Sequence, residues 1–255
     1  MRLQHSLPFL VALLVATPAL AQDAAALIAR GDSAHAAFDP ETALTAYEAA
    51  LALDSTKADV LAKASMSAVD LGESLADKTR QKELFKRAER YARGAVAADS
   101  TSAENWFHLA RAVGRTALTM GVKDRVKYAV EIKGWAERSL SLDPNHAGAL
   151  HVLGMWNAEV KRLNGVSLFF ARSFLGGGVL GQANWKNAVS YMERAVANDP
   201  ARLTHKLDLA GVYADVGEKD KARATYESVV NAETRTDFND PLYKKQAEAA
   251  LKKLR

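Results

Sequence analysis

The sequence predicts an all-α protein, an α-solenoid of about five antiparallel helix hairpins, from three observations. A helical pattern recurs five times along the chain. Hydrophobic residues make up 49% and charged residues 25%, as in soluble globular proteins rather than disordered or collagen-like chains. Every proline after residue 21 directly follows an aspartate, a pairing typical of helix starts with a polar cap. These pairs are Asp39-Pro40, Asp143-Pro144, Asp199-Pro200 and Asp240-Pro241.

Residues 1–21 have the pattern of a secretory signal peptide. A basic start is followed by the apolar run 7–16 and by small residues at Ala19 and Ala21. The alternative is an uncleaved membrane anchor, but the run is shorter than the roughly 20 residues that a span requires. We therefore expect cleavage near Ala21-Gln22, export to a periplasm or the exterior, and no transmembrane span in the remaining chain.

The recurring pattern is typical of the second helix of a hairpin. Its order is small-x3-large-x2-small, then an apolar residue and Asp-Pro or Asp-Ser. Small residues seven positions apart lie on one helix face, where a neighbouring helix can approach closely. The copies begin at Ala43, Ala88, Ile132, Ala188 and Ala222, and the last lacks the closing Asp.

Partner helices precede these copies. Trp106–Ala110 and Leu150–Gly154 share the spacing large-x2-Leu-small, and Leu27–Gly31 has Arg30 where Leu is usual. Two antiparallel helices in about 34 residues form a tetratricopeptide repeat. The copies are separated by 45, 44, 56 and 34 residues, and additions near 11 residues keep the same helix face inward. We therefore expect long helices at 57–78, 103–119, 123–142 and 146–175.

The repeats form a single domain over residues 22–255. A capping helix at 240–254 should follow, with Asp240 as N-cap and Pro241 in its first turn. Lys252, Lys253 and Arg255 suit its C-terminal end because the helix dipole favours cations there. The expected repeats are about 24–55, 56–100, 101–144, 145–200 and 201–233.

One part of the chain goes beyond a generic repeat. After the turn Leu142-Asp143-Pro144 comes Leu150-His151-Val152-Leu153-Gly154-Met155-Trp156, followed later by 187–195. This resembles the regulator of microtubule dynamics family, which has a similar His-Leu-Leu-Gly-Arg-Trp sequence after a Leu-Asp-Pro turn; here Met155 replaces the Arg. The resemblance covers about 100–255 and implies a partner-binding tetratricopeptide domain, with microtubule and lipid binding in eukaryotic members. Because export separates the chain from tubulin, we transfer the fold and retain a lipid-like ligand as an alternative.

Residue types with catalytic or metal-binding chemistry form no recognisable set. The chain has no cysteine, and His146 and His151 are five apart, on different helix faces. The glycines at 176–178 are not followed by Gly-Lys-Ser/Thr, so we interpret them as a helix connection rather than a nucleotide loop. The net charge of +4 is too small to indicate nucleic acid. We expect no catalytic residue, metal or cofactor.

Candidate groove residues lie one turn from the packing stripe of the first helices. Arginines beside Phe and Met can receive an anionic, partly apolar ligand or a peptide carboxylate. The alternative is that these arginines are simply solvated. The candidates are Phe107, Arg111, Arg115, His151, Met155 and Arg162.

The segment 163–175 is unusually apolar. Leu163, Val166, Phe170 and Phe174 follow a 3, 4, 4 spacing that suits a core stripe, whereas Phe169 projects off it. Either this helix is buried on two sides, or Phe169 lines a hydrophobic groove. We therefore expect a non-catalytic interaction module that binds a protein or peptide. The alternative is a lipid-binding carrier that uses this segment.

The signal-peptide interpretation can be tested directly. N-terminal sequencing of the exported protein should begin at Gln22 or within a residue or two of it. An intact Met1 in the membrane fraction would contradict the interpretation.

Overall fold

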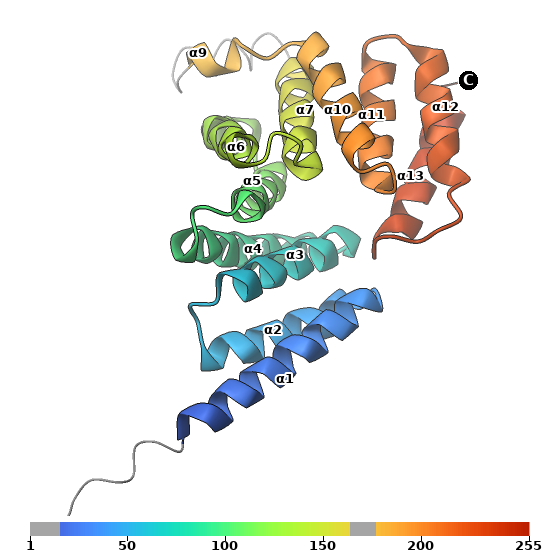
Figure 1. The fold of residues 1–255 in the computed structure, drawn as a ribbon. Coiled ribbons are helices and arrows are strands. Elements are labelled where there is room, and N and C mark those ends of the chain that lie inside the picture. Colours follow the sequence, from blue (N-terminus) through green and yellow to red (C-terminus); the bar gives the residue numbers. More distant parts are fainter. Residues whose placement is uncertain (1–15, 164–176, 255) are drawn as a thin grey trace, which may run out of the picture.

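The computed structural model describes residues 16–163 and 177–254. This part of the chain contains twelve helices and no strand, which confirms the all-α prediction (Figure 1). Five pairs pack as antiparallel hairpins, and α9 (Gly177–Leu180) and α13 (Asp240–Lys253) stand outside them. The hairpins are α1 (Ala16–Ala36) with α2 (Pro40–Leu53), α3 (Ala58–Ser74) with α4 (Lys78–Ala98), α5 (Ala103–Leu118) with α6 (Val122–Leu142), α7 (Ala147–Arg162) with α10 (Trp185–Asn198), and α11 (Leu203–Asp215) with α12 (Lys219–Val230).

The recurring aspartate ends the second helix of a hairpin and turns the chain. Asp54, Asp99 and Asp143 are C-caps in extended backbone, and each backbone N–H still bonds the carbonyl four residues earlier. Their carboxylates then accept hydrogen bonds from the N–H two residues later, at 2.9–3.1 Å. Such Asx turns direct the chain out of the helix. This local chemistry explains why the pattern closes with Asp.

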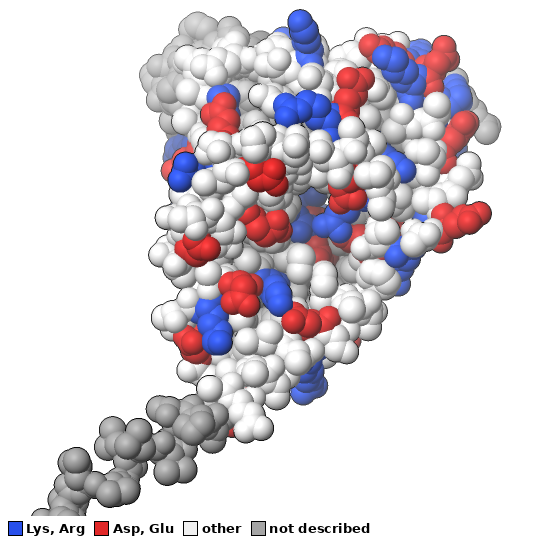
Figure 2. All heavy atoms as spheres, in the orientation of Figure 1, with Lys and Arg blue, Asp and Glu red and all other residues white. Residues whose placement is uncertain are grey.

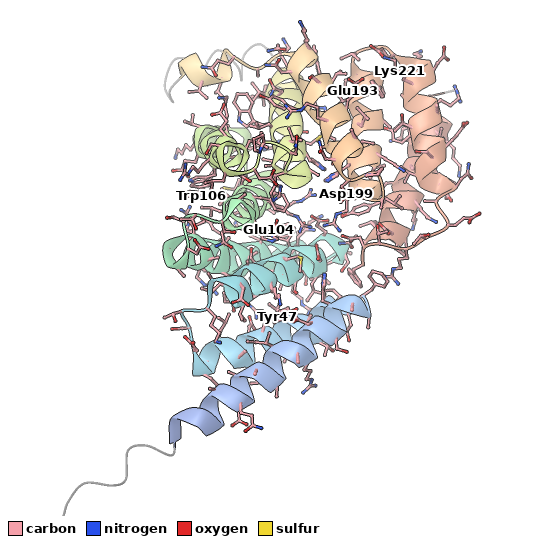
Figure 3. The ribbon with its side chains drawn as sticks, viewed as in Figure 1. Tyr47, Glu104, Trp106, Glu193, Asp199 and Lys221 are labelled. Atoms are coloured by element: carbon pink, nitrogen blue, oxygen red, sulfur yellow. The ribbon has the colours of Figure 1, made fainter. Side chains whose placement is uncertain are left out.

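Small residues allow the two helices of a hairpin to pack closely. The pattern positions Ala43, Ala88, Ala188 and Ala222 are all fully buried. In the first hairpin Tyr47 of α2 lies against Gly31 of α1, where an added Cβ would overlap the tyrosine ring (Figure 3). The predicted register therefore places the small positions at the helix contacts.

The long helices differ in part from the prediction. The additional residues lengthen α4 and α6, each of which has 21 residues. The helix predicted at 57–78 is wrong in extent, because α3 ends at Ser74 and Asp77 caps a new helix by accepting from the N–H of Thr79 at 2.9 Å. The continuous helix at 146–175 is also wrong, since α7 ends at Arg162 and Leu163 is in extended backbone. Phe169 and the rest of 164–176 lie outside the described residues.

Two apolar cores meet along α7. The N-terminal core joins α1–α6 and includes Trp156 and Val160, whereas the C-terminal core joins α10–α13 and includes Ala158. The chain curves between them, so the start of α13 returns to α3 (Figure 1). The N-cap of α13 is Asn239 rather than the predicted Asp240, which is the first helical residue. Among the described helices, none is long and apolar enough to cross a bilayer.

Replacing Gly154 by leucine should destabilise the fold. A Cβ at Gly154 would lie 2.6 Å from Cγ and Sδ of Met192 and 3.2 Å from its backbone nitrogen. Overpacking of this kind costs about 1–3 kcal/mol, and Ala195→Leu should behave alike because Ala195 is fully buried. Urea unfolding measures both effects.

Gly134→Leu on α6 is the matched control, since nothing lies within 4 Å of its added Cβ. That change should be neutral or stabilising, as glycine disfavours a helix interior by roughly 1 kcal/mol. Equal stability of the Gly154 and Gly134 variants would show that the assigned packing register is wrong.

Candidate binding cavity

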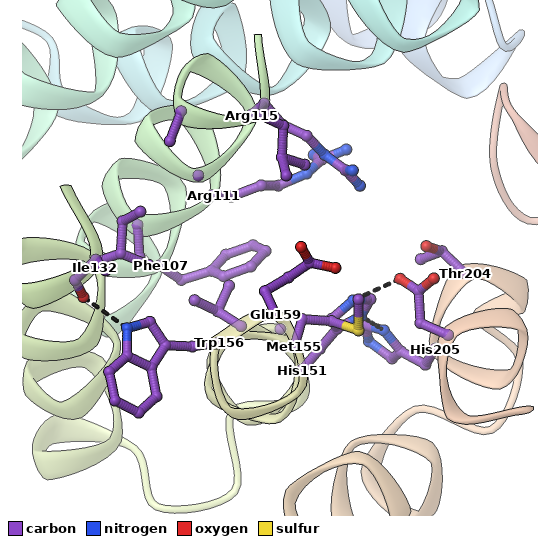
Figure 4. A pocket seen from close by; sticks show the side chains of 18 of the residues that line it. Phe107, Arg111, Arg115, Ile132, His151, Met155, Trp156, Glu159, Thr204 and His205 are labelled. Atoms are coloured by element: carbon purple, nitrogen blue, oxygen red, sulfur yellow. Dashed lines mark hydrogen bonds and ion pairs between the residues drawn. The ribbon is translucent and has the colours of Figure 1, made fainter. Parts of the chain in front are cut away.

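A cavity of about 190 Å³ lies between the two cores, on the concave side of the chain. Five of the residues predicted for the groove line it: Phe107, Arg111, Arg115, His151 and Met155 (Figure 4). On α5 and α7 these residues recur every four positions, which places them on one face of each helix. Residues of α6, α9, α11 and α13 and of the connecting loops complete the lining.

Of the other residues predicted for the groove, Arg162 does not line the cavity. Arg162 instead binds Asp215 through Nε at 2.9 Å and through Nη2 at 2.5 Å, and its Nη1 lies 2.6 Å from Glu159. It therefore ties the end of α7 to the end of α11. Phe169 lies outside the described residues.

Part of the lining is apolar. It contains Leu118, Ile132, Trp156, Val160 and Leu180, from helices α5, α6, α7 and α9. The indole N–H of Trp156 donates to the carbonyl of Ala129 at 2.7 Å, so the polar edge of this ring is satisfied (Figure 4). Leu118 is 46% exposed, and in the described part of the chain only Leu53 is a comparably exposed large hydrophobic residue. The cavity therefore offers an apolar contact that the chain itself leaves uncovered.

Two polar residues of the lining, Arg111 and Arg115, belong to a buried ion-pair network between α3 and α5. Arg111 lies 2.6 Å from Asp70 and 3.5 Å from Glu73, and Nε of Arg115 lies 2.7 Å from Glu73. Burial raises the pKa of Glu73, but the two arginines outweigh it and lower that pKa overall. Burial dominates at Asp70, so its pKa is raised. Both arginines thus have carboxylate partners, and this end of the cavity is charge-balanced rather than cationic.

The start of α13 completes this network. The hydroxyl of Tyr243 donates to Glu73 at 2.7 Å, and the side-chain amide of Asn239 donates to the carbonyl of Asp70 at 2.9 Å. In the loop before α13, Arg235 lies 4.5 Å above the ring of Phe38, between α1 and α2. We call these three contacts the latch. They join the C-terminal end of the chain to its first two hairpins.

A second, wider cleft of about 800 Å³ adjoins the cavity. Both spaces share Arg115, Leu118, Thr204, Asp208 and Tyr243 in their linings. The molecular surface is hollowed here, with acidic and basic side chains around the opening (Figure 2). Tyr243, whose hydroxyl bonds Glu73, therefore borders both spaces.

A histidine pair links α7 to α11 at the cavity. Nδ1 of His151 lies 2.5 Å from Nδ1 of His205, and Nε2 of His151 lies 3.0 Å from Asp208. Burial, together with the nearby His151 and Arg202, lowers the pKa of His205 to about 2. His205 is therefore neutral throughout the physiological range. Within the described residues no group of His, Asp or Glu side chains is arranged to hold a metal ion.

Sequence reasoning missed the acidic half of this site. Asp70 and Glu73 lie on α3, about 40 residues from their arginine partners, and Tyr243 follows 170 residues after Glu73. One signal was available, because Asp70 and Glu73 interrupt the apolar face of α3 three positions apart. Buried carboxylates on a core-facing stripe require a partner.

The fold and the concave cavity define a tetratricopeptide-repeat protein. The sequence model of the family described as Regulator of microtubule dynamics protein 1-3 matches residues 27–255. The chain belongs to this family, which confirms the resemblance found in the sequence. No curated protein matches the chain.

The solved structure of TTC0263 agrees with this fold assignment. A thermophilic tetratricopeptide-repeat protein of Thermus thermophilus, TTC0263, is 16% identical with a TM-score of 0.63, covering 89% of this chain and 99% of its own. PilF of Pseudomonas aeruginosa is 16% identical with a TM-score of 0.49, covering 91% and 90%. YrrB, described as a TPR protein with an unusual peptide-binding site, is 19% identical with a TM-score of 0.45, covering 92% and 97%. At 16% identity, the likeness to TTC0263 shows the fold alone.

The buried His205 should make the protein less stable in acid. In the unfolded chain a histidine gains its proton near pH 6.5, whereas the folded ring resists protonation until about pH 2. Protons therefore favour the unfolded state, and stability falls as pH drops below 6.5. From about pH 7.5 to about pH 5.5 this contribution is about 1 kcal/mol.

Urea unfolding at the two pH values measures the effect. His205→Asn should reduce the pH dependence by that amount, and His35→Asn, at an exposed position, is the matched control. Identical pH dependence in all three proteins would contradict a neutral, buried His205.

Proposed function

We propose that this protein is a non-catalytic interaction module that binds a segment of a partner protein in its concave cavity. The observation that carries the proposal is the uncovered Leu118 in a space lined by Phe107 and Met155. An exposed large apolar side chain inside a concave site is typical of an interaction surface. The tetratricopeptide fold supplies such surfaces without any further chemistry.

The polar groups of the cavity suit a peptide. The hydroxyl of Thr204 has no hydrogen-bond partner among the described residues, and it faces the same space as the guanidinium of Arg115 (Figure 4). Asp208 is 27% exposed and contributes a carboxylate beside them. Donors and acceptors thus lie side by side, as recognition of a peptide backbone requires, because each peptide unit carries one of each. A lone anion would meet Asp208 as a repulsive neighbour.

The lipid-like alternative has less support from the geometry. Pockets for drug-sized ligands have volumes of about 300–1,000 Å³. The apolar cavity is about 190 Å³, and the wider cleft beside it is lined mainly by polar and charged residues. We therefore retain a protein segment as the proposed ligand and treat a lipid as an outcome of the test.

We further propose that the mature protein acts outside the cytoplasm and begins near Gln22. From residue 21 onward, where burial is described, Ala24 is the first buried residue. Cleavage after Ala21 would therefore leave the buried contacts of α1 in place.

Site-specific crosslinking tests the cavity. A benzophenone amino acid at Leu118 should give a discrete adduct in the native exported fraction, because a bound segment would contact this side chain. The same residue at Leu53 is the matched control, since Leu53 is 43% exposed at the end of α2 and lies outside both cavity linings. Mass spectrometry of the adduct distinguishes a polypeptide from a lipid.

The identified segment should then be synthesised and titrated against the purified protein. Leu118→Asp should weaken its binding by about tenfold or more, as loss of a buried apolar anchor does. Equal adducts at both positions, or an unchanged affinity, would argue against the cavity as the binding site. A lipid adduct at Leu118 would replace the proposed ligand by the alternative.

A further inference from the structure

The positive charge of the chain is concentrated on α4. This helix carries seven basic and two acidic residues, an excess of five, while the whole chain has a net charge of +4. The rest of the chain is therefore slightly acidic. The basic residues of α4 are Lys78, Arg80, Lys82, Lys86, Arg87, Arg90 and Arg93, and the acidic ones are Glu83 and Glu89.

Three of these cations form a row without internal partners. Lys82, Lys86 and Arg90 recur every four residues on α4, so they follow one helix face with a rise of about 6 Å from one to the next. All three are exposed, and none has a hydrogen bond or ion pair among the described residues. We call them the basic row. Like charges four residues apart on a helix repel one another, so the row lowers the stability of the helix unless a partner neutralises it.

Two other basic residues of α4 form ion pairs with nearby carboxylates. Arg87 binds Glu48 of α2, which also accepts from the hydroxyl of Tyr91. Arg93 lies 2.8 Å from Glu89 on its own helix. The basic row lies on the exposed side of α4, where Glu89 follows Lys86 by three residues, but no ion pair joins the row to Glu48 or Glu89 among the described residues.

A cleft lies beside the row, between α4 and α6. It has a volume of about 440 Å³ and is lined by Lys82, Met120, Lys127, Tyr128 and Glu131. The thioether of Met120 and the ring of Tyr128 add apolar surface to a site where two lysines meet. A partner lying here would gain shape complementarity as well as attraction of charge.

The surroundings favour a narrow partner over a membrane. On the other side of α4 lies α2, which carries Glu41 and Glu48 and no basic residue. A flat anionic surface would meet these acidic groups together with the row. The basic row itself contains no large apolar residue that could enter a bilayer. A single acidic chain segment can follow the row at a distance from α2, and in the cleft it would meet two lysines and one acidic residue, Glu131.

We propose that the basic row and the α4–α6 cleft form a second interaction surface, which binds an acidic segment of another protein. This surface is separate from the concave cavity, although Lys82 also lies at the margin of the wider cleft. The partner is defined by its chemistry: carboxylates spaced to meet cations along one helix, with an apolar group for the cleft.

Binding of a fluorescein-labelled decaglutamate peptide to the full chain tests this surface. The variant Lys82→Glu/Lys86→Glu/Arg90→Glu should raise the dissociation constant by about tenfold or more, and added salt should weaken wild-type binding because it screens exposed charges. The matched control is Lys186→Glu/Lys219→Glu/Lys245→Glu, three exposed lysines on α10, α12 and α13 with the same change of net charge. It should alter the constant by less than about threefold.

Two further measurements keep the outcomes distinct. Leu118→Ser, which adds no charge to the wider cleft that Lys82 also lines, should bind decaglutamate like the wild type, and this separates the surface from the concave cavity. The neutral set Lys82→Gln/Lys86→Gln/Arg90→Gln should also weaken binding, and it replaces the reversal variant if that variant loses its helical circular dichroism.

Equal losses in the row and control variants, or no binding by the wild type, would overturn the proposal. Vesicles of phosphatidylcholine with about 30% phosphatidylglycerol are the membrane probe. Row-dependent binding of these vesicles without binding of the peptide would assign the surface to a membrane instead.

Discussion

The buried ion pairs between α3 and α5 are the constraint on which the concave side of this protein depends. Arg111 is held by Asp70 and Glu73 in surroundings largely removed from water. Desolvation costs several kcal/mol for each ion, so none of these groups can lose its partner cheaply. The pairs therefore fix α5 against α3, and through Glu73 they also fix the hydroxyl of Tyr243 on α13. These contacts hold the start of α13 against α3 across the concave side.

The same network explains why a cavity persists between the two cores. The cores share α7, where Trp156 and Val160 face one core and Ala158 faces the other. Across the concave side they are joined by hydrogen bonds of Tyr243 and Asn239 rather than by apolar packing. Polar contacts specify a separation but bury little area, so space remains on both sides of them. An apolar closure at this place would instead have collapsed to the density of a core.

Local sequence patterns were sufficient to predict most of the fold. The buried Ala88 and Ala188 and the turn at Asp99 are readable from sequence because their partners lie within a hairpin. The inward direction of Arg111 is readable for the same reason, since it follows from helical spacing. Its partner Asp70 belongs to another hairpin, and the contact of Asn239 with Asp70 spans 169 residues. Neither contact can be predicted from helical periodicity, because that pattern relates only residues of one helix. The end of α7 was missed because an apolar stripe continues past Leu163 in sequence while the helix does not.

The two proposed surfaces contribute differently to binding: the basic row attracts a partner, and the cavity selects it. In the cavity each guanidinium of α5 has a carboxylate neighbour, so selectivity there depends on shape, on Leu118 and on hydrogen bonds at close range. On α4 the charge of the basic row is uncompensated and acts at distances up to the screening length, about 8–10 Å at physiological salt. Long-range attraction mainly raises the rate of encounter, whereas buried contacts determine how long a complex lasts. A partner with an acidic segment near a segment that fits the cavity would use both surfaces, and its affinity would exceed that of either alone because the second contact forms within one complex.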